Sequence, residues 1–168
     1  CAHTQTSFIE QVIYEMCVQV FGTDKVLSRD RSILGFELDI VVLSDNKEPI
    51  FAIEPGSWTL HKNYADKDLF KIEACKKKNI DLLIIYDQKK ETTSNDTDNI
   101  WWYTNSFNRA NDVNIKALLE RIAVRFGFDI SKIDYKLIKK TANDHSRRMS
   151  TSDITEKVKS INPMIEVM

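Results

Sequence analysis

The sequence of 168 residues lacks several features that indicate other classes of protein. It holds 3 cysteines, an odd number at no motif spacing, and Cys17 and Cys75 lie among apolar neighbours, so buried reduced thiols are expected. Its longest apolar runs are strand-sized, well below the roughly 18–20 residues that span a bilayer, and no signal peptide is visible at its start. These absences predict a cytoplasmic protein with no membrane partner.

An excess of basic charge is also missing. Lysine and arginine number 24 against 25 aspartates and glutamates, which gives a formal net charge of −1. A global electropositive field that would attract nucleic acid is therefore excluded, and any contact with DNA must come from a local patch. The length suits one compact α/β domain with a substantial core and is too short for two large ones.

Hydrophobic periodicity predicts the element order α-β-β-α-β-β-α, which indicates a mixed β-sheet flanked by helices. The helices are expected at residues 7–21, 64–78 and 115–126, and the strands at residues 36–43, 50–54, 80–86 and 100–103. Thr6 or Ser7 suits the N-cap of the first helix, and Gly22 suits its end. The polar segment 24–32 is assigned no element, and Pro55-Gly56 is expected to end the second strand.

The last part of the chain differs in composition from the rest. We assign residues 1–130 to the α/β domain and residues 131–168 to a basic C-terminal extension. Within the extension, residues 141–152 have the composition of a linker, and residues 153–161 are expected to form a short helix.

Two acids lie inside apolar strand segments, where a carboxylate is costly. Asp39 and Glu54 each interrupt such a run, and a buried charge without its partner costs about 3–5 kcal/mol. Since side chains alternate along a strand, Glu37 and Asp39 share one face of their strand, and Glu54 on the next strand can meet Asp39 there. A divalent metal ion shared by Asp39 and Glu54 would offset the cost.

Further polar residues follow this pair. His61 lies seven residues after Glu54, and Asp68 and Lys71 lie three apart on the next predicted helix. By itself the last spacing indicates an ordinary ion pair between Asp68 and Lys71. Hydrolysis of a phosphodiester needs carboxylates that hold a metal ion, a group that activates water, and cations that stabilise the charge developing on phosphate. The set contains each type.

Four segments carry a resemblance to a known family. They read TSFIEQVIYEM, GFELDIVV, AIEPGSWTLH and DLFKIEACKKKNIDLLIIYD, and together they cover residues 6–87, about half of the chain. The pattern resembles the PD-(D/E)xK nuclease superfamily, in particular the branch of very-short-patch-repair endonucleases and EDxHD homing endonucleases. The resemblance implies a restriction-endonuclease-like core and a DNA endonuclease that depends on Mg²⁺ or Mn²⁺.

Carried over residue by residue, the resemblance implies a role for each polar group. It implies that Asp39 is the principal metal ligand and that Glu54 is a second acid near it. His61 would be a general acid or base, and Lys71 would face the phosphate. Glu10 would be the helix acid and Asp68 the last acid of the motif. At the three positions after Glu54 the family typically has tyrosine, then asparagine or aspartate, then glycine. This chain has Pro55, Gly56 and Ser57 there. Gly56 also replaces the lysine of the wider superfamily. Because relatives often carry upstream zinc-ribbon modules, a missing upstream module is expected, with Cys1 as its remnant.

The best local candidate for contact with DNA is basic. It comprises the C-terminal residues Lys139, Lys140, Arg147 and Arg148, together with Lys62 beside His61.

Two alternatives stay open beside the endonuclease. One is an inactive nuclease fold that binds DNA or protein, and the other is a structural domain whose acidic hairpin face is solvent-exposed. The sequence leaves the oligomeric state open, a homodimer included.

Overall fold

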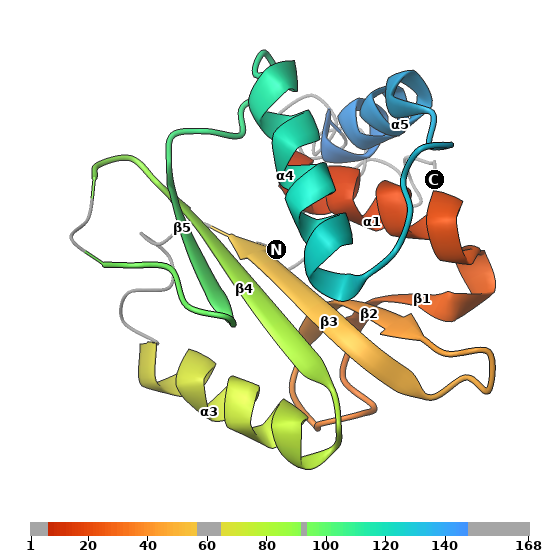
Figure 1. Ribbon diagram of the computed structural model, residues 1–168, viewed down its shortest axis with the longest axis vertical. Helices are drawn as coiled ribbons and strands as arrows, with labels where there is room; N and C mark the ends of the chain where they lie inside the picture. The colour runs from red at the N-terminus through yellow and green to blue at the C-terminus, as the bar shows by residue number, and fades with distance from the viewer. Residues whose placement is uncertain (1–6, 57–64, 92–93, 148–168) are drawn as a thin grey trace, which may run out of the picture.

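The computed structural model describes residues 7–56, 65–91 and 94–147, which build a five-stranded mixed sheet with helices on both faces (Figure 1). The strands are β1 (Val26–Asp30), β2 (Leu38–Leu43), β3 (Pro49–Gly56), β4 (Asp81–Gln88) and β5 (Ile100–Thr104), and they lie in this order across the sheet. The pairs β1–β2 and β2–β3 are antiparallel, whereas β3–β4 and β4–β5 are parallel. The predicted α/β class with a mixed sheet is confirmed.

The sheet separates two apolar clusters, each covered by helices. Figure 1 shows α1 (Phe8–Phe21), α4 (Asp112–Phe126) and α5 (Tyr135–Arg147) on one face of the sheet and α3 (Ala65–Lys77) on the other. A short 3₁₀ turn, η2 (Thr23–Lys25), connects α1 to β1. Side chains of β3 and β4 alternate between the faces, and those of β2 do so from Ile40 to Leu43. The central strands are therefore covered on both sides.

The predicted first helix is confirmed together with its start and end. The Ser7 hydroxyl caps α1 by accepting a hydrogen bond from the backbone N–H of Glu10 at 3.1 Å. Gly22 ends the helix with a φ of 95°, a conformation that costs glycine little. Cys17 and Cys75 are buried free thiols, as expected.

Two predictions about the strands are wrong. Residues 26–30 form β1 although the sequence assigns no element there, because an edge strand keeps polar side chains toward solvent. β3 does not end before Pro55 but continues through Gly56, pairing in parallel with β4. The β2–β3 ladder stops at Ile40–Ile53, so Pro55, which has no N–H to donate, removes no bond on that side.

The linker predicted from residue 141 is also wrong as far as residue 147. α5 occupies this stretch and packs on α1, with the fully buried Ile138 and Ala142 in the same apolar cluster as the α1 side chains. Asp134 accepts a hydrogen bond from the Leu137 N–H at the start of the helix. The boundary proposed after residue 130 therefore does not separate α5 from the core. The short helix expected at 153–161 lies outside the described residues.

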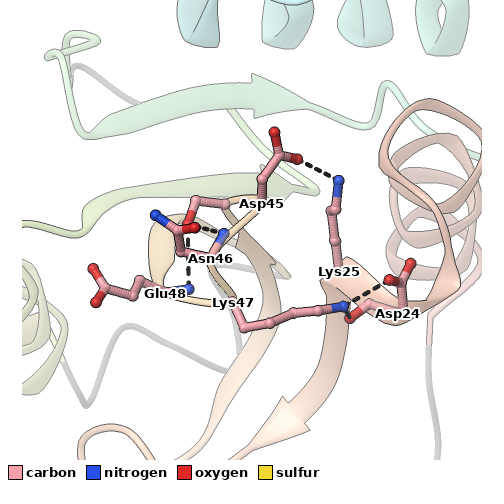
Figure 2. A network of polar contacts seen from close by, with 7 residues as sticks. Asp24, Lys25, Asp45, Asn46, Lys47 and Glu48 are labelled. Carbon is pink, nitrogen blue, oxygen red and sulfur yellow. Dashed lines mark hydrogen bonds and ion pairs between the residues drawn. The ribbon is translucent and has the colours of Figure 1, made fainter.

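An exposed charged network fastens the β2–β3 turn to η2, and we call it the turn network (Figure 2). Lys25 pairs with Asp45, and Lys47 pairs with Asp24 at 2.6 Å. The Ser44 hydroxyl accepts hydrogen bonds from two backbone N–H groups of the turn. The turn network lies at the N-terminal end of β3.

Among the helices of the described residues, none is both long and apolar enough to cross a membrane.

Candidate active site

A row of charged residues crosses three strands at the other end of β3. In the register of β1 against β2, Ser28 pairs with Ile40 and Asp30 with Leu38, so Arg29 and Asp39 lie between these two pairs. The register of β2 against β3, continued one residue beyond its last pair Ile40–Ile53, sets Asp39 opposite Glu54. Because side chains alternate along each strand, Asp39 and Glu54 share the face that α3 covers. The two acids thus meet on one face, as the alternation in the sequence indicates.

Lys71 of α3 reaches over this face to Glu54. Its ammonium donates to Glu54 Oε1 at 2.8 Å and to the backbone carbonyl of Glu37 at 2.9 Å. The pair is enclosed, with 3% of the Glu54 side chain and 13% of the Lys71 side chain exposed. The spacing in the sequence indicated an ion pair between Asp68 and Lys71. In the structure Lys71 of α3 pairs with Glu54 of β3 instead.

Asp68 instead contacts a residue of β4. The Tyr86 hydroxyl donates to Asp68 Oδ2 at 2.6 Å, and both side chains are buried. Burial and this hydrogen bond raise the pKa of Tyr86 far above its usual value, so the phenol keeps its proton. The contact anchors the first half of α3 to β4 beside Glu54.

Glu10 enters the group from the first turn of α1. Its Oε2 lies 3.4 Å from Nε of Arg29, and 7% of the Glu10 side chain is exposed. Burial raises the pKa of Glu10, and the charge of Arg29 opposes that rise. We call Glu10, Asp39, Glu54, Asp68 and Lys71 the acid cluster. Arg29 was not anticipated, because no pattern in the polar segment 24–32 indicated a strand.

The acids of this cluster raise one another's pKa. Burial, followed by the charge of Glu10, raises the pKa of Asp39 to about 7, although Lys71 opposes the shift. Burial, followed by the charge of Asp39, raises the pKa of Glu54 to about 7 despite its bond to Lys71. Both carboxyl groups therefore titrate in the neutral range, well above the usual range of an aspartate or glutamate.

One oxygen of this pair lacks any hydrogen bond. Within the described residues, Glu54 Oε2 is buried and unpaired, and the Asp39 carboxylate accepts no hydrogen bond. Glu54 is only 2% exposed, so the alternative in which the acidic hairpin face points to solvent is wrong for this residue. A buried acceptor without a donor is what a bound cation or a proton would satisfy.

The donor set fits Mg²⁺ or Mn²⁺, which prefer carboxylate oxygens. In the described part of the chain, no three histidine, cysteine or acidic side chains are arranged to hold a metal ion. Mg²⁺ commonly binds through one or two carboxylates and completes its octahedron with water and substrate phosphate. Asp39 and Glu54 provide that smaller set.

The remaining predicted residues lie elsewhere. His61, Lys62 and Arg148 are outside the described residues, as is the side chain of Arg147. Lys139 pairs with Asp112 at 2.8 Å, and Lys140 is exposed. Both line a groove of about 610 Å³ formed by α4 and α5, which cover the sheet face opposite α3. Both lysines belong to α5, whereas Lys71, which bonds to Glu54, comes from α3 on the opposite face of the sheet.

Comparison of the chain with known protein families, curated proteins and solved structures finds no match. The functional inferences therefore rest on the geometry of the acid cluster and on the motifs in the sequence.

Proposed function

We propose that the protein is a metal-dependent DNA endonuclease with a restriction-endonuclease-like core of the PD-(D/E)xK type. One observation supports this proposal most: an oxygen of Glu54 that is buried and has no partner among the described residues lies on the same sheet face as Asp39, with a lysine bonded to the other Glu54 oxygen. Two carboxylates that can hold a metal ion and a lysine that can stabilise charge on phosphate are groups that hydrolysis of a phosphodiester requires.

The topology agrees with the proposal. An antiparallel hairpin, β2–β3, carries the two acids, and the helix α3 leads from β3 to a parallel neighbour, β4. The lysine that the superfamily places two residues after the second acid is Gly56 here. Lys71 supplies an ammonium at the same carboxylate from α3, which supports its assignment as the functional replacement.

Each member of the cluster has a chemical task in this proposal. Asp39 and Glu54 would hold Mg²⁺ or Mn²⁺, which supplies Lewis acidity toward a phosphate oxygen. Lys71 orients Glu54 in the free protein and lies where it can stabilise negative charge on phosphate. The Asp68–Tyr86 bond fixes the helix that carries Lys71. His61, as predicted from the sequence, would transfer a proton to or from water or the leaving group.

Nicking of supercoiled plasmid with Mg²⁺ or Mn²⁺ tests the proposal. We expect the wild-type chain to nick, and Asp39→Asn to lower the rate on the order of 10³-fold, because the substitution removes a charged ligand worth several kcal/mol. Asp45→Asn is the matched control, since Asp45 belongs to the turn network at the far end of the hairpin. Absence of nicking, or nicking that survives in Asp39→Asn, would exclude the proposed activity.

A second candidate is an inactive nuclease fold that binds DNA. It is favoured by the absence, among the described residues, of a third side chain arranged to hold a metal ion. This candidate predicts binding of a fluorescent DNA duplex that is unaffected by EDTA and by Asp39→Asn. Metal-dependent nicking by the wild-type chain would rule it out.

A further inference from the structure

We infer that the groove between α4 and α5 binds the phosphate backbone of DNA, and that it does so without a divalent metal ion. The choice of DNA as the partner rests on the proposed function, whereas the charge of the groove does not depend on it. We call this feature the basic groove. It lies between helices on the sheet face opposite α3, the helix whose Lys71 bonds to Glu54 (Figure 1).

The basic groove holds more positive charge than the chain as a whole. Four lysines and two aspartates line it, although the whole chain carries a net charge of −1. One of the aspartates, Asp112, is already compensated. It accepts hydrogen bonds from the Lys139 ammonium and from the Tyr135 hydroxyl, each at 2.8 Å, and these bonds lower its pKa. Three further lysines then stand against one remaining acid of the lining, Asp144.

These three lysines keep their ammonium groups available. Lys116, Lys136 and Lys140 are exposed, and none of them forms an ion pair or a side-chain hydrogen bond with the residues that the structure describes. Lys116 of α4 extends over the ring of Tyr135, with its Nζ 4.8 Å from the ring centroid. Lys136 and Lys140 are four residues apart on α5 and therefore lie on one side of that helix.

The arrangement of these groups suits a chain of phosphates. The available cations extend along one turn of α5 and across to α4 rather than converging on one point, so they match successive charges better than a single anion. Asn143 adds a neutral donor, because its Oδ1 accepts a bond from Arg109 at 2.9 Å and its N–H₂ group remains. Lysine and amide donors are common partners of backbone phosphates. Counterion release drives such binding, which needs no metal ion.

The salt dependence of binding tests the inference. We measure the affinity of the full chain for a fluorescent DNA duplex in EDTA at several salt concentrations. The double variant Lys136→Gln/Lys140→Gln should lose roughly 30–100-fold in affinity near 0.1 M salt. Its slope of log affinity against log salt should fall by about 1.8, because each lysine–phosphate contact contributes about 0.9. Asp144→Asn should instead raise the affinity a few-fold, because it removes a negative charge beside the phosphates.

The matched control is Lys90→Gln/Lys132→Gln, which removes the same charge from two exposed lysines that do not line the basic groove. It should leave the slope unchanged. An equal loss in both double variants would mean that DNA responds to net charge alone, and the inference would be wrong. Should a double variant unfold in a melting experiment, the single variants Lys136→Gln and Lys140→Gln decide, each with about half the change in slope.

Two further results would overturn the inference. One is a wild-type chain that does not bind the duplex in EDTA. The other is displacement of the duplex by polyglutamate as readily as by unlabelled DNA at equal charge concentration, because the basic groove would then accept any polyanion.

Plasmid nicking separates the failure of the inference from the failure of the proposed function. The double variant Lys136→Gln/Lys140→Gln should raise KM rather than lower kcat, because the basic groove supplies binding and not chemistry. Nicking with a wild-type KM in this variant would remove the basic groove from DNA binding and leave the endonuclease intact. A wild-type chain that never nicks, but whose DNA affinity falls in this variant, would remove the endonuclease and keep the inference.

Discussion

The two ends of the β2–β3 hairpin carry the same kinds of charged residue in opposite arrangements. In the turn network Asp24 and Asp45 each pair with a lysine, and both aspartates are exposed to water, Asp45 to 93% (Figure 2). In the acid cluster Glu10, Asp39 and Glu54 lie close enough to shift one another's pKa, and one buried oxygen of Glu54 has no donor in the part of the chain that the structure describes. The turn network pairs each of its aspartates with a lysine, whereas in the acid cluster several neighbouring acids surround Lys71.

The pKa shifts have opposite signs in the two regions. Lys47 lowers the pKa of Asp24, and Lys25 lowers the pKa of Asp45, in each case mainly through a hydrogen bond. Burial raises the pKa of Asp39 and of Glu54 to about 7. At one end of the hairpin lysines therefore favour ionised carboxylates, and at the other end burial opposes their ionisation.

The largest change is expected from Lys71→Met, which leaves Glu54 buried without its cation. Breaking a buried ion pair from one side costs about 3–5 kcal/mol of unfolding free energy, and we expect a loss of that order at pH 8. At pH 5 the loss should shrink, because Glu54 then takes up a proton. Urea denaturation at both pH values measures the difference. An equal loss at both would assign the effect to the bond from Lys71 to the Glu37 carbonyl.

Divalent metal should have the next largest effect. Binding to the folded chain alone raises the free energy of unfolding by about 2.7 kcal/mol at a concentration 100 times Kd. Thermal unfolding with Mn²⁺ at pH 8 should show this increase, and the increase should fall at pH 6, because the ligands must lose their protons. Asp39→Asn should abolish it, and Asp45→Asn should not. A similar increase in all three chains would indicate binding outside the acid cluster.

Removing a charge from the cluster should stabilise the protein free of metal. The folded pKa of Asp39, about 7, exceeds its reference value of 3.8, so the folded state holds more protons between these values. Its contribution to stability is therefore greatest at low pH and declines as pH rises to about 7.

The amide in Asp39→Asn does not ionise, so its stability does not decline in this way. We expect its free energy of unfolding to exceed that of the wild type by about 0.5–2 kcal/mol at pH 8 and by less at pH 5. Urea denaturation in EDTA gives both values. For Asp45, whose pKa is lowered, the sign reverses, so Asp45→Asn should show no gain. A loss of stability in Asp39→Asn at pH 8 would mean that the carboxylate is well compensated in the free protein.

The smallest change is expected in the turn network. Lys47→Met removes an exposed ion pair, and pairs of this kind contribute little because water and salt screen them. Its melting temperature should stay close to that of the wild type, and any difference should vanish in 1 M salt. A large decrease in melting temperature that persists in 1 M salt would show that interactions other than charge pairing in the turn network hold η2 to the turn.

The sequence was sufficient to locate helices and strands that bury one face, because burial places apolar residues at a regular spacing. Apolar spacing located α1, α3 and α4, together with β2, β3, β4 and β5, because each buries a face against the sheet or a helix. The period of two also indicated that Asp39 and Glu54 share a face. It could not indicate β1, an edge strand whose polar residues obey no such period. In α5 the apolar spacing of Ile138 and Ala142 was present but hidden among charged residues.

By itself, then, the sequence determined the α/β class, the positions of two costly acids and the identities of the groups around them. Only the tertiary structure decided the partners. Lys71 bonds to Glu54 rather than to Asp68, because α3 crosses over the sheet, and Arg29 contacts Glu10, because β1 packs beside α1. Local spacing fixes which side of an element a residue occupies, and packing between elements fixes which charge it meets.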